Sequence, residues 1–146
     1  ISNWGMGIAS KALLGTQATI SGNQPTGLTV GEMITITGAG VPFDGAFTIT
    51  GTPSANVIQY TTTAITVAQA ALTSDVATLT TTAAHGLDVG QAIQVTGIAN
   101  STFNGWYIVT AVPSTTTFSY ARTAANIVSA SASGSIEVLT SYAVPN

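Results

Sequence analysis

Charged residues are the scarcest feature of this sequence of 146 residues. Only 5% of its residues are Asp, Glu, Lys or Arg, whereas globular domains usually carry about 25%. Protein surfaces usually stay soluble through net charge and mixed charge. The shortage therefore indicates either a Thr- and Ser-rich secreted β-protein or a subunit whose surface is largely covered in an assembly, and we favour the assembly. The complete charged set is Lys11, Glu32, Asp44, Asp75, Asp88, Arg122 and Glu137.

Several other absences narrow the function. Two cations are too few for the several phosphate contacts that nucleic-acid binding normally needs, so nucleic acid is not an expected partner. The lack of cysteine excludes disulfides, thiolate metal sites and cysteine catalysis. No apolar run approaches the 18 or so residues of a membrane span, and no basic stretch followed by an apolar segment marks a signal peptide. A membrane is therefore not an expected partner either.

The chain contains one phrase twice. TGLTVGEMITITG begins at Thr26 and HGLDVGQAIQVTG begins at His85, at an offset of 59 residues. After one inserted residue the offset becomes 60, and the match continues to Tyr60 and Tyr120. A match over roughly 45 residues indicates a tandem duplication with the period of a small domain. Six shared glycines are candidate turn residues that define the fold: Gly27, Gly31, Gly45, Gly86, Gly90 and Gly105.

Apolar residues alternate with polar ones in both copies, which is typical of half-buried strands. The alternating pairs are Ile34 and Ile36, Phe47 and Ile49, and Ile58 and Tyr60 in the first copy, and Ile93 and Val95, Tyr107 and Val109, and Phe118 and Tyr120 in the second. Ile20 and Leu79 mark an earlier strand in each copy. Ile136, Val138 and Leu139 mark a late strand, for which Ile65 and Val67 are the weaker first-copy counterpart. Asp44-Gly45 and Asn104-Gly105 predict tight hairpins.

These patterns predict an all-β protein: two tandem small antiparallel β-barrel or sandwich units with an extended N-terminal arm. The expected divisions are an arm over 1–16, a first unit over 17–70, a second unit over 71–140 and a tail over 141–146. Helical periodicity is found only from Ser10 to Leu14, where a short helix is expected, and Ser129 to Ser135 is expected to be a flexible connection. A unit of about 60 residues buries only about 60% of its unfolded surface, which again favours association.

The differences between the copies weigh against catalysis, because no ionisable side chain recurs. His85 is the only histidine and lies three residues from Asp88, so a Ser-His-Asp arrangement is arithmetically possible, but Thr26 and Thr29 replace both in the other copy. We interpret His85 as a turn residue that stabilises the chain at the Gly86 bend. One imidazole and five dispersed carboxylates offer neither a metal cluster nor a glycosidase pair. The sequence predicts no enzyme activity, no catalytic residue, no metal and no cofactor.

The strand around Trp106 is apolar on both predicted faces. If Tyr107 and Val109 point into the core, Trp106 and Ile108 point the other way, whereas the first copy has Ala46 and Thr48 there. The two units then pack on each other at this strand, or the strand contacts a partner, for which Trp is a favoured anchor. We extend the candidate partner interface to the N-terminal arm, which either folds over the first unit or reaches a neighbouring subunit. The candidate interface residues are Trp4, Met6, Ile8, Leu13, Leu14, Trp106 and Ile108.

The sequence HGL-x-VG, followed by alternating apolar residues, FNG and VPSTTTFSY, resembles a module repeated in structural proteins of tailed bacteriophages. The resemblance covers residues 77–120 well and 18–60 more loosely. It implies a structural role in the virion and carries over no catalytic residue. We expect a capsid decoration or cement protein on the capsid surface, with the phage major capsid protein and further copies of itself as partners. It would stabilise the head by burying apolar surface, at roughly 25 cal/mol per Å².

Two alternatives remain open from the sequence. The chain is a tail component, such as a tube, terminator or baseplate-associated subunit, for which the same module fits. Or it is a carbohydrate- or host-surface-binding module, in which Trp4, Trp106 and Tyr142 would stack on sugars. Copy number in the particle discriminates head from tail, and a glycan array tests the carbohydrate alternative.

Overall fold

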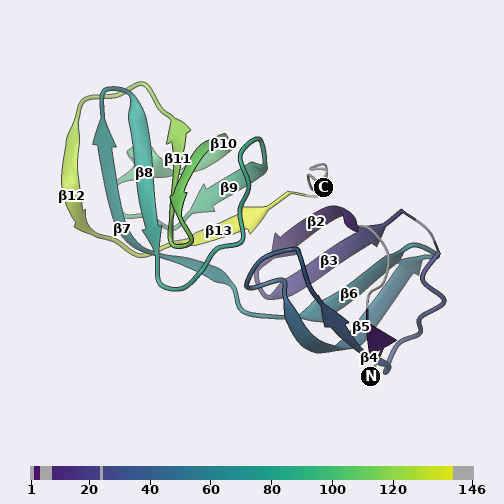
Figure 1. The fold of residues 1–146 in the computed structure, drawn as a ribbon. Coiled ribbons are helices and arrows are strands. Elements are labelled where there is room, and N and C mark those ends of the chain that lie inside the picture. Colours follow the sequence, from purple (N-terminus) through teal and green to yellow (C-terminus); the bar gives the residue numbers. More distant parts are fainter. Residues whose placement is uncertain (1, 4–7, 24, 140–146) are drawn as a thin grey trace.

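The computed structural model describes residues 2–3, 8–23 and 25–139, and the fold is all-β, as predicted (Figure 1). In this part of the chain the only helical element is a single 3₁₀ turn, η1 (Ser101–Phe103). No helix in the described ranges is long and apolar enough to cross a membrane. The strands are β1 (Ser2–Asn3), β2 (Ile8–Leu14), β3 (Gln17–Gly22), β4 (Met33–Ile36), β5 (Gly45–Ser54), β6 (Val57–Thr61), β7 (Ile65–Thr73), β8 (Val76–Thr81), β9 (Ala92–Thr96), β10 (Gly105–Ser114), β11 (Thr117–Ala121), β12 (Ile127–Ser131) and β13 (Ser135–Val138).

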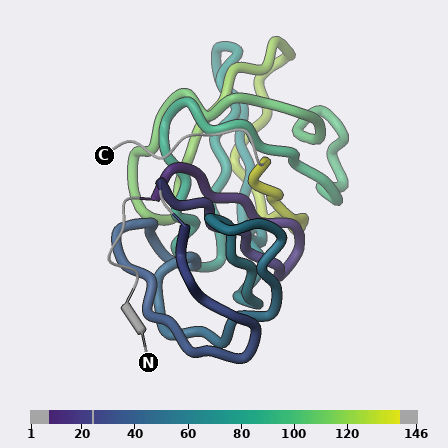
Figure 2. Tube along the Cα trace, turned by 90° about the vertical axis from the view of Figure 1, so that its right-hand side faces the viewer, coloured from purple at the N-terminus to yellow at the C-terminus, as the bar shows by residue number. Residues whose placement is uncertain are grey.

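The duplication extends to strand order and register. Strands β2 to β6 form the first unit, and β7 to β11 repeat them in the second. Leu13 lies opposite Ala18 in the first unit, and Leu72 lies opposite Ala77 in the second. Figure 1 shows the two units as two bodies, the first purple to blue and the second teal to yellow, and in the turned view of Figure 2 the second unit lies above the first and overlaps it.

The second unit closes into a six-stranded antiparallel barrel in the order β7-β8-β11-β10-β9-β13, because β13 pairs with both β9 and β7. Strand β12 adds to the other part of β7. In the first unit the two-residue parallel strand β1 pairs with β4, at the position where β13 pairs with β9. The end of β13 also reaches the first unit, where Val138 pairs with Leu13 of β2.

Each core is organised around one buried tyrosine. The Tyr60 ring stacks on Phe47 at 4.3 Å between ring centroids, and the Tyr120 ring stacks on Tyr107 at 4.0 Å. The alternating residues that predicted strands supply most of the buried set, because every second side chain of a strand points inward. That buried set includes Ile20, Ile34, Ile36, Ile49, Ile58, Leu79, Ile93, Val95, Val109, Phe118, Ile136 and Val138.

The structure corrects several local expectations. Residues 10–14 are part of strand β2 and not a helix, because β2 pairs along its length with β3. Ile65 and Val67 belong to β7, which begins the second unit by pairing with β8 instead of ending the first unit. The division expected between residues 70 and 71 therefore falls inside β7, and residues 8–14 of the expected arm form an inner strand.

Two loops also differ from expectation. Residues 129–131, expected in a flexible connection, form the end of β12. The tight hairpins expected at Asp44-Gly45 and Asn104-Gly105 are longer loops, because Ile36 at the end of β4 already pairs with Gly45. The carboxylate of Asp44 closes its loop by accepting the backbone N–H of Ala39 at 2.8 Å.

Candidate functional site

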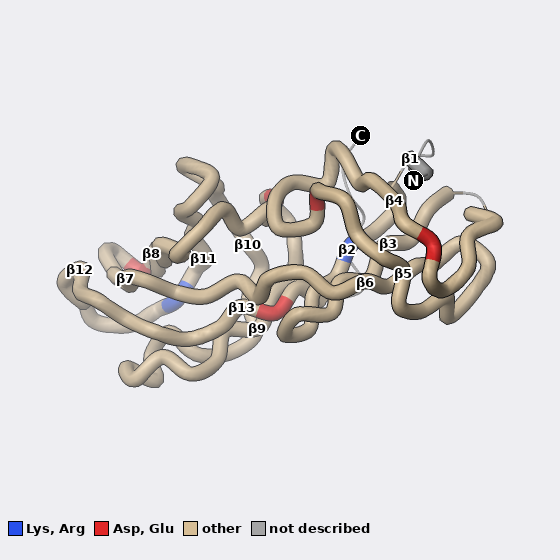
Figure 3. Tube along the Cα trace, turned by 90° about the horizontal axis from the view of Figure 1, so that it is seen from below, with Lys and Arg blue, Asp and Glu red and all other residues tan. Residues whose placement is uncertain are grey.

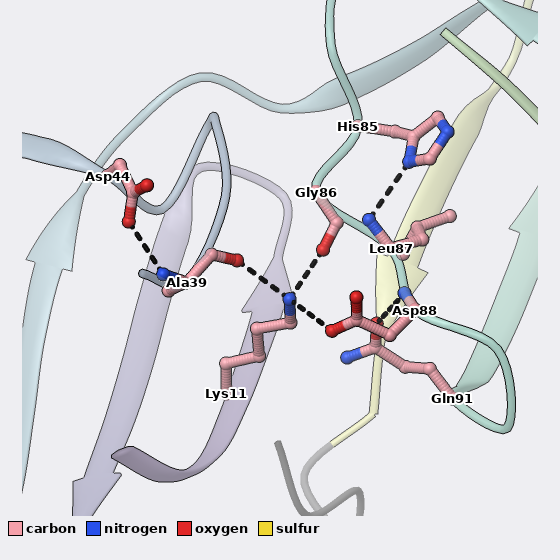
Figure 4. A network of polar contacts seen from close by, with 8 residues as sticks. All are labelled: Lys11, Ala39, Asp44, His85, Gly86, Leu87, Asp88 and Gln91. Atoms are coloured by element: carbon pink, nitrogen blue, oxygen red, sulfur yellow. Dashed lines mark hydrogen bonds and ion pairs between the residues drawn. The ribbon is translucent and has the colours of Figure 1, made fainter. Parts of the chain in front are cut away.

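The side chain of Lys11 joins the two units (Figure 4). It extends from β2 of the first unit and is only 1% exposed. Its ammonium donates to the carbonyl oxygen of Ala39 at 2.7 Å, to that of Gly86, and to the carboxylate of Asp88 at 3.0 Å. Ala39 belongs to the first unit, whereas Gly86 and Asp88 belong to the second. Because three acceptors satisfy the three donors of the ammonium, Lys11 fixes one unit against the other.

Lys11 is a departure from the repeat. It lies opposite Ile20 on β3, and the same position in the second unit is Ala70, opposite Leu79 on β8. The Lys11 ammonium also lies 5.2 Å from the ring centroid of Phe43, at cation–π range. The lysine therefore serves the junction between the units and not the fold that both units share.

His85 holds the turn that meets Lys11. Its Nδ1 accepts the backbone N–H of Leu87 at 2.9 Å, so this nitrogen carries no proton. The proton therefore lies on Nε2, which donates toward the carbonyl oxygens of Thr117 at 3.0 Å and Ser114 at 3.2 Å. Burial lowers the pKa of His85 below its usual value, and the positive charge of Lys11 lowers it further. The imidazole is thus a neutral turn residue with no free nitrogen for catalysis.

The other copy performs the same task with a hydroxyl. Thr26 stands in place of His85, and its Oγ1 accepts the backbone N–H of Leu28 at 3.1 Å. The Gly86 bend has a positive φ of 64°, which favours glycine, and a Cβ at that position would lie 2.6 Å from the carbonyl oxygen of Val41 in the first unit. Glycine at 86 therefore permits the close contact between the units. All six predicted turn glycines have positive φ.

Gln91 is the one buried side chain in the described residues that has a nitrogen without a hydrogen-bond partner. Its Oε1 accepts the backbone N–H of Asp88 at 3.2 Å, and its Nε2 has no acceptor. Glu32, the matching residue of the first unit, accepts the backbone N–H of Thr29 in the same way at 2.9 Å. Glu32 and Gln91 thus both supply a side-chain oxygen that accepts this backbone N–H. Only the amide nitrogen of Gln91 has no counterpart in this contact.

A second candidate site is an exposed apolar face on the second unit. Trp106 is 67% exposed and Ile108 is 53% exposed, and the two lie two residues apart on the same face of β10. Ile108 lies opposite Ala92 of β9, and the two line a shallow pocket of about 350 Å³ with Trp106 and Leu139. We call Ala92, Trp106, Ile108 and Leu139 the apolar face. The alternative that the two units pack on each other at this strand is wrong, because both large side chains face solvent.

The structure divides the remaining predicted interface residues. Ile8 and Leu13 are buried in the core, so the expectation that they contact a partner is corrected. Leu14 is exposed at the end of β2 and stays a candidate. Trp4 and Met6 lie outside the described residues, as does Tyr142.

The described residues offer little reactive chemistry. They contain no group of three or more His, Asp or Glu side chains that could hold a metal ion. Figure 3 shows that charged positions are scattered along the molecule and not gathered into one patch. What the arrangement provides is apolar contact area on one face and a tightly bonded junction between two small units.

Reasoning from the sequence missed the role of Lys11. The signal was present in the repeat, because the second copy has alanine where the first has a lysine inside an apolar strand. Comparison of the chain with protein families, curated proteins and solved structures finds no match.

Proposed function

We propose that this protein is a non-enzymatic structural subunit of a bacteriophage virion, a capsid decoration protein that stabilises the head through apolar contacts between subunits. The observation that carries the proposal is the apolar face, where Trp106 and Ile108 are exposed on a chain that has only 5% charged residues. A partner that covers them gains about 1.5–3 kcal/mol for each large apolar side chain that it buries.

The difference between the copies supports a dedicated contact. Ala46 and Thr48 occupy the positions of Trp106 and Ile108 in the first unit. The fold of a unit therefore does not require large apolar side chains on this outer surface. Trp is also one of the three residue types enriched at the energetic centre of interfaces.

The experiment is co-sedimentation of the purified chain with phage heads that lack it. The test variant replaces Trp106 by Ala and Ile108 by Thr, which gives the second unit nearly the outer surface of the first. We expect attachment to weaken by at least about 30-fold, which corresponds to roughly 2 kcal/mol, while circular dichroism retains its β-type spectrum. Val128→Ser is the control, because Val128 is 87% exposed on β12 and outside the apolar face.

The outcomes separate the alternatives. Undiminished attachment of the Trp106 and Ile108 variant would remove the apolar face from the proposal. Attachment to isolated tails and not to heads would favour a tail component. The exposed indole of Trp106 is also what a carbohydrate-binding site would use for stacking, so binding on a glycan array that the same variant abolishes would favour that function instead.

A further inference from the structure

The junction between the units contains a cavity of about 580 Å³ with one wall from each unit. The first-unit wall is the loop 38–41. The second-unit wall is the turn 84–88 together with Val112, Ser114 and Thr115. Lys11 crosses between the two walls. This cavity therefore lies where the loop 38–41 of the first unit packs against the turn 84–88 of the second.

Each wall recurs in the other unit, where it lines a groove of its own. The turn and its neighbours recur in the first unit as a groove of about 410 Å³, which we call the first-unit groove and which is lined by Pro25, Gly27, Leu28, Thr52, Ser54 and Ala55. The loop recurs in the second unit as a groove of about 430 Å³, which we call the second-unit groove. Its lining includes Ile98, Ala99, Asn100 and Phe103, with β12 residues such as Ala130 on the opposite side.

Backbone hydrogen bonds establish that the walls are equivalent. In the first unit the N–H of Thr26 donates to the carbonyl oxygen of Ala55 at 2.9 Å, and in the second that of His85 donates to Thr115 at 3.0 Å. The loops agree as well. The N–H of Phe43 donates to the carbonyl oxygen of Gly40 at 2.7 Å, and that of Phe103 donates to the carbonyl oxygen of the corresponding Asn100 at 3.2 Å.

Residues that lie at the junction differ in their surroundings from their counterparts in the two grooves. Gly40 of the first-unit loop is half-buried where it packs against Gly86, whereas its counterpart Asn100 in the second-unit groove is exposed. A Cβ at Gly86 would collide with the first unit, whereas a Cβ at Gly27 would meet nothing within 4 Å. Among the described residues there are thus one completed junction and two unused halves of the same kind, of which the second is bordered by β12.

We propose that a second copy of this chain completes the unused halves: the first-unit groove of one copy docks on the second-unit groove of the next, in the manner of the junction within the chain. Because the two surfaces differ, the contact is heterologous, and it propagates head to tail into a ring or a filament. The inference does not rest on the proposed virion role, since neither groove includes Trp106 or Ile108.

The contact between copies lacks the ion pair of the internal junction. Ala70 and Thr29 stand in place of Lys11 and Asp88, so apolar contact replaces the charged bridge. Association should therefore change little with ionic strength, because no exposed charge pair is screened. It should also be weaker than the internal junction and reversible on dilution.

Sedimentation velocity with two blocking variants tests the proposal. Ala99→Arg places a charge in the second-unit groove, and Ala55→Arg places one in the first-unit groove. Each buries an unpaired charge at the contact and should leave monomer alone. A 1:1 mixture should form a dimer and nothing larger, because each variant retains one working surface. Ala46→Arg, exposed on β5 outside both grooves, is the control and should assemble like the wild type.

Three results would overturn the proposal. They are a wild-type chain that is monomeric at about 1 mM, single variants that still assemble, and a mixture that forms no dimer. If Ala99→Arg loses its β-type circular dichroism spectrum, Ala130→Arg blocks the same groove from β12. Loss of self-association with attachment to heads retained would leave the proposed function intact, and the reverse result would leave this inference intact.

Discussion

Tyr60 and Tyr120 hold equivalent positions in the two units, and each donates its hydroxyl proton to the backbone of its own loop. The acceptor is the carbonyl oxygen of Phe43 for Tyr60 and that of Phe103 for Tyr120, at 2.7 Å in both cases. Burial is the main cause that raises the pKa of both phenols above the ordinary value. Tyr60 therefore ties the loop between β4 and β5 to the core beneath it, and Tyr120 does the same for the loop between β9 and β10.

Replacing either tyrosine by phenylalanine should lower the free energy of unfolding by about 1–2 kcal/mol, because a buried carbonyl loses its donor. Denaturant unfolding followed by circular dichroism measures the loss. The two single variants serve as matched controls for each other. A loss at one position with no loss at the other would contradict the equivalence of the two loops.

Lys11→Ala reproduces the residue that the second unit has at the same position, Ala70. It should lower the free energy of unfolding by about 2–4 kcal/mol, because the carbonyl groups of Ala39 and Gly86 lose their donor. Asp88→Thr, which copies Thr29, should cost about 1 kcal/mol or less, since Asp88 is 41% exposed and the pair is partly screened. Equal losses at the two positions would show that the ion pair, and not the carbonyl contacts, dominates.

His85 should make stability depend on pH. Its pKa is lowered in the folded chain, so the unfolded chain takes up the proton first as the pH falls. The contribution of His85 is fully present above its unfolded pKa of about 6.5 and is lost as the pH falls through the lower folded pKa. Denaturant unfolding between about pH 7.5 and pH 5, above the range in which carboxylates titrate, measures the slope.

His85→Thr is the matched variant for this prediction, because Thr26 performs the same backbone contact in the first unit. The variant should keep the turn and remove the pH dependence in that range. A wild-type slope that survives in the variant would assign the titration to another group.

The sequence predicted the general architecture because a duplicated, strictly alternating pattern leaves few choices. Ile34, Ile36, Ile93 and Val95 point inward as their period of two requires. The strand over Ile8–Leu14 was not predicted, because Ala and Leu favour helices locally and only the pairing with β3 makes them a strand. In β2 the pairing with β3 outweighs the local preference of these residues for a helix.

The site was harder to predict than the fold. Alternation around Trp106 identified two apolar faces, but only the structure shows that the outer one faces solvent. The junction depends on Lys11 reaching Gly86, a contact between residues 75 positions apart. No local pattern encodes such a contact, although comparing Lys11 with Ala70 in the other copy would have singled it out.

Electron cryo-microscopy of the assembled phage particle tests the central claim most directly, by locating this chain and counting its copies. We predict copies on the order of hundreds in a symmetric array on the head, with Trp106 and Ile108 buried against a neighbour. About six copies, or a few multiples of that number, confined to the tail would contradict the head assignment. A particle without the chain would contradict the structural role altogether.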